Sequence, residues 1–270
     1  MRVVLFIALI SCFCSVKGQI EVVTMPGEYV EALNYGGKTE FKRFLQHEMN
    51  YPKIALANET EGIVEVSAII ENKTGKKSKI HIKKSVSKEL DAEAIRLFKM
   101  LLFNPPFYKG DRVTTYSTLK FKFSTKLYKR YCKRRAYENS VTEKVDSVKP
   151  FIVYRDNQVR VKPKVLFKDT LENISTFIQK NMKYPQGTLS LNITGTAKLF
   201  FVVEPSGRIT NIKLLRPVGG GGSEEAIRLL ELTNWKSGEK GGVKVRVSKT
   251  FEVNFNLTND TGIDYVPPRY

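Results

Sequence analysis

Few side chains in this sequence have the types and spacing that catalysis or metal binding requires. His47 and His81 are the only histidines, and neither lies in a His-Glu-x-x-His motif or beside a nucleophile elbow. Asp91 and Glu93 resemble a pair of catalytic carboxylates. Their position at the start of a predicted helix is better explained by capping and by the helix dipole. The sequence therefore predicts a non-enzymatic protein with no metal and no cofactor.

The elements that carry these residues occur twice in the chain. Residues 93–97 (EAIRL) return as residues 225–229, and a spacing of 132 also relates an aromatic and a glycine further on. Upstream, a Tyr-Pro pair and a glycine recur at a spacing of 133, because one residue is lost in a turn where deletions do least harm. The matched positions are Phe103 with Trp235, Gly110 with Gly242, Tyr51-Pro52 with Tyr184-Pro185, and Gly62 with Gly195.

Each copy has the same predicted order of helix, strand, strand, helix and strand. In the first copy, alternating apolar residues from Gly62 to Ile70 indicate a strand with one buried face. Thr39, Asp91 and Ser223 have the side chains of helix N-caps. The predicted first-copy elements are a helix from Thr39 to before Tyr51, strands at 62–70 and 78–84, a helix from Asp91 and a strand at 113–123. Those of the second copy are a helix at 176–182, strands at 197–203 and 209–215, a helix from Ser223 and a strand at 243–255.

The ends of the chain and the segment between the copies complete the predicted organisation. Residues 1–18 have the charge, short apolar run and small-residue end of a cleaved signal peptide, which predicts a periplasmic protein. The alternative is an outer-membrane lipoprotein with a lipid on Cys12. The predicted divisions are a lead-in at 19–35, domains at 36–124 and 164–257, a basic linker at 125–163 and a disordered tail at 258–270. We expect the two domains to fold independently, with protease cleavage between them.

The predicted linker begins with a run of basic residues. Loss of the signal lowers the formal net charge from +18 to +16, because Arg2 and Lys17 leave with it. An excess of positive charge of this size indicates an anionic partner. Nucleic acid is excluded as that partner, because the chain is predicted to be exported. The run either binds an anionic cell-wall or membrane surface, with its tyrosines adding contacts, or is a solvated linker or the tail of a strand. Its candidate anion-binding residues are Lys126, Lys129, Arg130, Lys133, Arg134 and Arg135.

The ordered set of repeated motifs resembles the C-terminal domain of TonB, the periplasmic energy transducer. The resemblance covers about 85 residues in each copy and rests on the Tyr-Pro pair, the glycine before an alternating strand, a turn glycine, the Glu-Ala-Ile-Arg sequence and an aromatic followed by glycine. The first copy also has the paired Gly36-Gly37. It departs from the family in having Phe103 in place of tryptophan, and the second copy has Asp169-Thr170 in place of the paired glycines.

This resemblance implies an α+β fold of two tandem domains, each a three-stranded antiparallel sheet packed against two helices. It also implies that an extended segment of an outer-membrane TonB-dependent receptor, or another envelope protein, adds to a sheet edge. The predicted edge is the third strand, whose outward-facing residues include Lys120 and Glu252. The family's partner contacts correspond to Tyr51, Pro52, Tyr184 and Pro185, for which a purely structural role is the alternative.

TonB also has an uncleaved transmembrane helix and a proline-rich spacer, and we find neither in this sequence. We therefore predict an exported binding or adaptor protein related to TonB-dependent transport. The alternative is an envelope scaffold that binds an anionic surface through the basic linker.

Overall fold

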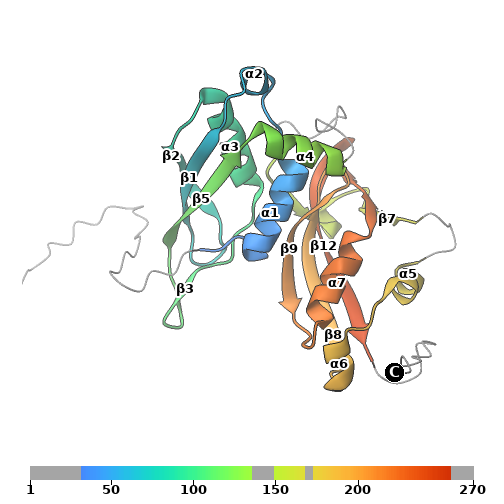
Figure 1. The fold of residues 1–270 in the computed structure, drawn as a ribbon. Coiled ribbons are helices and arrows are strands. Elements are labelled where there is room, and N and C mark those ends of the chain that lie inside the picture. Colours follow the sequence, from blue (N-terminus) through green and yellow to red (C-terminus); the bar gives the residue numbers. More distant parts are fainter. Residues whose placement is uncertain (1–31, 136–148, 168–172, 257–270) are drawn as a thin grey trace, which may run out of the picture.

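The computed structural model describes residues 32–135, 149–167 and 173–256, and the predictions for the signal peptide, Cys12 and the tail lie outside these ranges. The first copy is built on a three-stranded antiparallel sheet in the order β2-β1-β5, packed against α3 (Figure 1). Its elements are α1 (Gly37–Glu48), α2 (Lys53–Ala57), β1 (Gly62–Ile70), β2 (Lys77–Lys84), α3 (Lys88–Met100), β3 (Phe107–Tyr108), β4 (Asp111–Arg112), β5 (Thr115–Phe123) and α4 (Thr125–Arg135).

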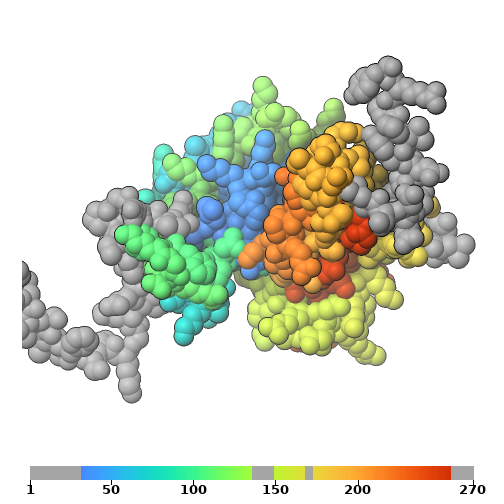
Figure 2. All heavy atoms as spheres, turned by 90° about the horizontal axis from the view of Figure 1, so that it is seen from below, coloured from blue at the N-terminus to red at the C-terminus, as the bar shows by residue number. Residues whose placement is uncertain are grey.

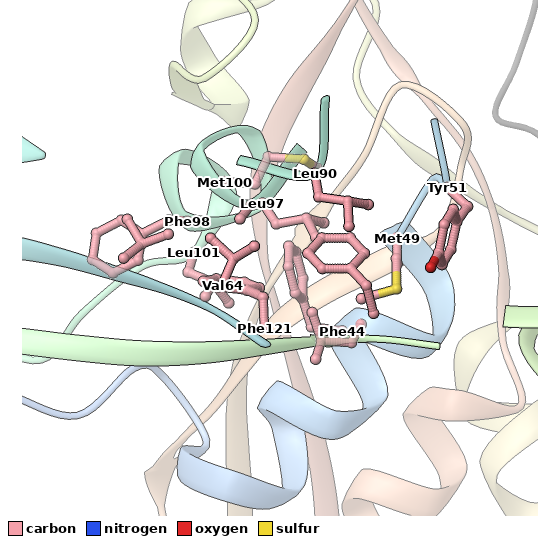
Figure 3. Packing of buried hydrophobic residues seen from close by; sticks show 14 of the residues in the cluster. Phe44, Met49, Tyr51, Val64, Leu90, Leu97, Phe98, Met100, Leu101 and Phe121 are labelled. Carbon is pink, nitrogen blue, oxygen red and sulfur yellow. The ribbon is translucent and has the colours of Figure 1, made fainter. Parts of the chain in front are cut away.

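The core of the first copy lies between this sheet and the helices. The predicted alternation holds in the first half of β1, where Val64 is fully buried in the same core as Leu97 of α3 (Figure 3) and Glu65 is not buried. The prediction of a single buried face is wrong for the second half, because Ser67 and Ile69 on the other face are buried as well. Phe44 of α1 and Phe121 of β5 fill the same core. Each such side chain contributes about 1.5–3 kcal/mol on burial, so the apolar faces of β1 and α3 stabilise the fold.

The second copy repeats this plan and enlarges its sheet. The antiparallel strands β12, β8 and β9 form the common part, β11 pairs with β12, and β6 adds to β12 in parallel. The α+β fold with two tandem copies is thus confirmed, with extra strands in the second. The elements are β6 (Val153–Arg155), the 3-10 helix η1 (Asp156–Gln158), β7 (Lys164–Leu166), α5 (Ile174–Asn181), α6 (Gln186–Ser190), β8 (Gly195–Val203), β9 (Ile209–Arg216), α7 (Gly222–Glu231), β10 (Asn234–Lys236), β11 (Gly238–Lys240) and β12 (Val243–Phe255).

The three predicted helix caps are wrong because each helix begins earlier than its polar residue suggested. Helix α1 already includes Thr39, and Ser223 lies in the first turn of α7. Ser87 caps α3, with its hydroxyl accepting a hydrogen bond from the amide of Leu90 at 3.3 Å. Asp91 instead accepts hydrogen bonds from the two residues before Ser87, and so fixes the entry to the helix.

Much of the segment predicted as a basic linker belongs to the folded copies. Helix α4 packs on the first core through Tyr128 and Tyr131, which are 3% and 8% exposed. Strand β6 and η1 add to the second copy instead. The two tyrosines of α4 are therefore core residues, and the prediction that they contact an outside surface is wrong.

Two equivalent glycines show why a turn glycine and a later aromatic recur together. Gly75 and Gly207 have φ angles of 70° and 83°, a region that favours glycine. A Cβ atom on Gly75 would lie 2.2 Å from the carbonyl oxygen of Phe103, and one on Gly207 would lie 2.3 Å from that of Trp235. Each turn therefore packs directly on the backbone of its aromatic residue.

We expect Gly207→Ala to lower the free energy of unfolding by about 2–4 kcal/mol, because it adds a backbone clash to the strain of a left-handed residue. Gly242→Ala is the matched control, since Gly242 also has a positive φ of 77° but no atom within 4 Å of a Cβ. It should cost only about 1–2 kcal/mol. Urea unfolding followed by tryptophan fluorescence measures both values, and equal losses would contradict the close packing of this turn.

Candidate strand-binding edges and the boundary between the copies

The Glu-Ala-Ile-Arg sequence of α3 holds the segment that leads into Tyr51 and Pro52. The carboxylate of Glu93 accepts hydrogen bonds from the backbone amide of Asn50 at 2.8 Å and from the guanidinium of Arg96 at 2.7 and 2.8 Å. Arg96 also donates to the carbonyl of Glu48 at 2.5 Å. Helix-dipole stabilisation, which the sequence suggested for Glu93, is therefore not its main role.

The second copy repeats this clamp with its own residues. Glu225 accepts from the backbone amide of Lys183 at 2.6 Å, and Arg228 donates both to Glu225 and to the carbonyl of Asn181. Sequence reasoning found the recurring motif but missed this function. The indication was its recurrence at a fixed distance from the Tyr-Pro pair in both copies.

The two Tyr-Pro pairs differ in how much of them a partner could reach. Tyr51 is 2% exposed, packs edge-on against Phe123, and donates its hydroxyl to the carbonyl of Thr60 at 2.5 Å. It offers almost no surface for direct partner contact. Tyr184 packs edge-on against Phe255 and is only partly buried. Its hydroxyl oxygen is buried and makes no hydrogen bond with the residues that the structure describes.

The prolines of both pairs have structural positions. Pro52 is the N-cap residue of α2, and Pro185 is that of α6. Both are partly exposed. Pro52, Tyr184 and Pro185 thus remain available as predicted contacts.

Strand β5 forms one edge of the first sheet. It pairs with β1 in continuous register from Thr115 to Phe123, and no second described strand pairs with it. Tyr116 and Thr118 have further contacts of their own. Lys120 lies on the outer face of this strand, with its side chain 70% exposed and its ammonium 3.5 Å from the carboxylate of Glu65. Such an edge presents backbone donors and acceptors that an extended segment can satisfy.

Strand β2 forms the opposite edge and is less suited to strand addition. Its pairing with β1 has two register shifts, and Lys79 has a positive φ of 49°. Exposed lysines continue along it at Lys83 and Lys84. Bulges of this kind are a feature by which proteins prevent edge-to-edge pairing. They distinguish β2 from β5, which also carries exposed lysines, at Lys120 and Lys122, but pairs with β1 in a continuous ladder.

Strand β12, the second-copy equivalent of β5, is only partly open. Its residues from Val243 to Val245 pair with β11, and those from Arg246 to Ser248 pair with β6. Only the seven residues from Lys249 to Phe255 have no described partner on this side. The prediction of an open edge along all of 243–255 is therefore wrong for its first half, because β6 comes from the supposed linker. Glu252 lies in the open half and pairs with Lys198 at 2.7 Å.

The outer edge of β9 is covered by the first copy. Asn211 has a φ of 55°, and its side-chain oxygen accepts a hydrogen bond from the amide of Leu102 at 2.7 Å. Its side-chain nitrogen donates to the carbonyl of Met100. Figure 2 shows α1, in blue, in contact with the orange part of the second copy at this boundary.

Two acidic residues of α1 make further contacts across the boundary. The carboxylate of Glu40 accepts a hydrogen bond from the amide of Ile212 at 3.1 Å and pairs with Arg43 at 2.7 Å. Burial raises the pKa of Glu40 despite these partners. Glu48 pairs with Arg208 of the second copy at 2.9 Å. These contacts fix the position of α1 against β9.

An ion pair buried in the second copy also reaches the first. Arg246 and Glu204 are 2% and 1% exposed, and two hydrogen bonds of 2.8 Å join the guanidinium to the carboxylate. Arg246 also donates to the carbonyl of Met100 at 2.8 Å. Burial raises the pKa of Glu204, and the hydrogen bonds that it accepts from Arg246 and Thr210 act in the opposite direction.

The two histidines lie apart and in different surroundings. His47 lines a groove of about 850 Å³ at the boundary, where burial and the charges of Arg43, Arg208 and Arg135 lower its pKa to about 4. His81 is exposed on β2. In the described part of the chain no three His, Cys, Asp or Glu side chains gather closely enough to hold a metal ion.

The predicted anion-binding residues separate into two groups on α4. Five of them are exposed: Lys126, Lys129, Arg130, Lys133 and Arg134. Arg135 turns inward, where it donates to the carbonyls of His47 and Met49 at 3.2 and 2.8 Å. It therefore fastens α4 to the end of α1.

Comparison with protein families agrees with the repeated fold. The family model described as the Gram-negative bacterial TonB protein C-terminal domain matches residues 47–125 and again residues 180–257. The chain belongs to this family. A search of curated proteins finds no match to the chain.

The TonB C-terminal family accounts for both copies of the chain. The two matched segments confirm a tandem pair of TonB C-terminal domains in an envelope protein. Domains of this family are non-enzymatic, and they serve in binding and in energy transduction. Among the described helices, none has the length and apolar character needed to cross a membrane.

Proposed function

We propose that this chain is a periplasmic, non-enzymatic adaptor that captures an extended segment of a TonB-dependent receptor, or of another outer-membrane or envelope protein. Capture occurs by strand addition to β5 of the first copy. The observation that carries this proposal is the edge of β5 from Leu119 to Phe123, where the ladder with β1 is continuous and no second described strand pairs with it. Main-chain hydrogen bonds would supply much of the affinity.

The contrast among the four sheet edges supports β5 as the binding site. The pairing of strand β2 has two register shifts, β9 is covered by α1 and by the segment after α3, and β12 is occupied over its first half. The clamp formed by Glu93 and Arg96 then fixes Pro52 near the end of β5, since Tyr51 packs on Phe123. The first copy thus offers a regular edge beside its Tyr-Pro pair, and the open half of β12 is a second one.

Capture is tested by proline substitution at two adjacent positions of β5. Backbone N–H groups alternate sides along a strand, so Leu119→Pro and Lys120→Pro remove one donor toward β1 and one toward the open edge. The variant that loses the inner donor should be less stable. We expect the other to remain folded and to lose at least about tenfold in partner capture, with Leu119→Ala and Lys120→Ala as controls for the side chains.

Capture is measured by a photoreactive amino acid at Lys122, with crosslinked envelope proteins identified by mass spectrometry. The same amino acid at Lys83 of β2 is the control position. We expect an outer-membrane receptor or envelope protein to crosslink from Lys122 and not from Lys83. Two folded proline variants that both crosslink normally would exclude strand addition at β5. A catalytic turnover abolished by His47→Ala or His81→Ala would instead place the protein among enzymes.

A further inference from the structure

The exposed side of α4 consists entirely of cations. Its five exposed residues are Lys126, Lys129, Arg130, Lys133 and Arg134. In the part of the chain that the structure describes, no acidic side chain forms a salt bridge with any of them. The apolar residues of the helix face the core instead. The helix therefore presents a row of positive charges that no described acidic side chain pairs with.

The basic surface continues from α4 onto α1. Arg134 donates a hydrogen bond to the side chain of Gln46 at 3.0 Å. Lys42 and Lys38 lie four and eight residues before Gln46, so all three share one face of α1. Both lysines are exposed and form no salt bridge with a described acidic residue. We call these seven cations the α1–α4 basic face.

Both ends of α4 are fastened to the first copy, so this face is rigid at the level of the backbone. Glu61 accepts two hydrogen bonds of 2.7 Å from the amide and hydroxyl of Thr125 at the start of the helix. Arg135 binds the end of α1 at the other end, and Tyr128 packs against Tyr51 between them. In Figure 1, α4 crosses the end of the first copy above α1. The helix thus holds its cations in a fixed row.

We propose that the α1–α4 basic face binds the surface of a lipid bilayer that contains anionic headgroups. The face is a row of side chains on a convex helix, and the grooves at the boundary between the copies are lined by other residues. Shaped ligands are usually held in concave sites, whereas a fluid layer of headgroups adapts to a convex row of charges. Because Tyr128 and Tyr131 are buried, attachment is electrostatic and does not involve insertion of this helix.

The row has the size that such attachment requires. From Lys126 to Arg134 the helix rises about 12 Å, so its five cations face several headgroups at once. Each Lys or Arg close to an anionic surface contributes about fivefold to binding at moderate ionic strength. Removal of three charges should thus weaken binding about 100-fold. This binding is independent of strand capture at β5.

The test compares two triple variants of the full chain with the same loss of charge. One is Lys129→Gln with Arg130→Gln and Lys133→Gln on α4, and the other is a control on β2 and α3. The control changes exposed lysines away from the face: Lys83→Gln, Lys84→Gln and Lys88→Gln. Co-sedimentation is measured with vesicles of phosphatidylcholine, with and without phosphatidylglycerol, at low and high salt. Thermal unfolding establishes that both variants are folded.

We expect the unsubstituted protein to bind only the anionic vesicles and to be released by high salt. The α4 variant should bind about 100-fold more weakly, and the control variant should lose less than about fivefold. Equal losses in the two variants would show that net charge alone drives binding and would overturn the proposal. The proposal would also be overturned if the protein bound the soluble anion polyglutamate through α4 but did not bind anionic vesicles.

Discussion

Replacing Arg246 with methionine is expected to lower the free energy of unfolding by about 3–5 kcal/mol, the cost of breaking a buried ion pair by removing one partner. The substitution leaves Glu204 buried at 1% exposure without its counter-ion, and it leaves the carbonyl of Met100 without that donor. Urea unfolding measures the loss. A loss below about 1 kcal/mol would show that water or another group replaces the guanidinium.

Two further variants separate the ion pair from simple loss of a side chain. Glu204→Leu combined with Arg246→Met removes both charges, so it should recover most of the stability that the single substitution loses. Lys198→Ala breaks the exposed pair with Glu252 on the same sheet and should cost less than about 1 kcal/mol. The contrast between these two pairs measures the effect of burial.

The loss in the single variant should also depend on pH. Burial raises the pKa of Glu204, and without Arg246 this carboxyl is more readily protonated in the folded state. When the pKa of a carboxyl is higher in the folded than in the unfolded state, the group stabilises the fold at a pH below its unfolded pKa. This stabilisation is lost as the pH rises through the folded pKa. The deficit of Arg246→Met should therefore be smaller at acidic pH than at neutral pH.

The fold was predictable because its determinants occur in both copies. The alternation in β1, the Glu-Ala-Ile-Arg clamp and the glycine that packs on an aromatic backbone serve each copy separately, so they recur at a fixed spacing. Recurrence does not reveal hydrogen-bond partners, however. Glu93 looked like a helix-dipole residue because its acceptor role depends on Asn50, which lies 43 positions earlier.

The boundary between the copies was not predictable by the same route, because it uses residues at which the copies differ. Arg246 corresponds to Thr114 in the first copy, and Asn211 corresponds to Lys79. A comparison of repeats gives weight to shared residues and passes over such positions. Helix α4 was missed for a different reason, since its many cations concealed the apolar face formed by Leu127, Tyr128 and Tyr131.

The sequence led us to expect two copies that fold independently, whereas the boundary contacts lead us to expect a single unfolding transition. Glu40 and Asn211 satisfy backbone groups across the boundary, namely the amides of Ile212 and Leu102. Each buried group left without a partner costs about 1–3 kcal/mol. Glu40→Ala combined with Asn211→Ala should therefore lower the stability by about 2–6 kcal/mol and uncouple the copies.

Two probes distinguish coupled from independent unfolding in this chain. Trp235 is the only tryptophan and lies in the core of the second copy, so its fluorescence reports on that copy, while far-ultraviolet circular dichroism reports on both. We expect the two unfolding curves to coincide in the unsubstituted protein and to separate in the double variant. Asn58→Ala combined with Glu224→Ala changes the same residue types at exposed positions and should leave the curves coincident. Separate curves in the unsubstituted protein would instead establish that each copy folds alone and that the boundary contacts add little to its stability.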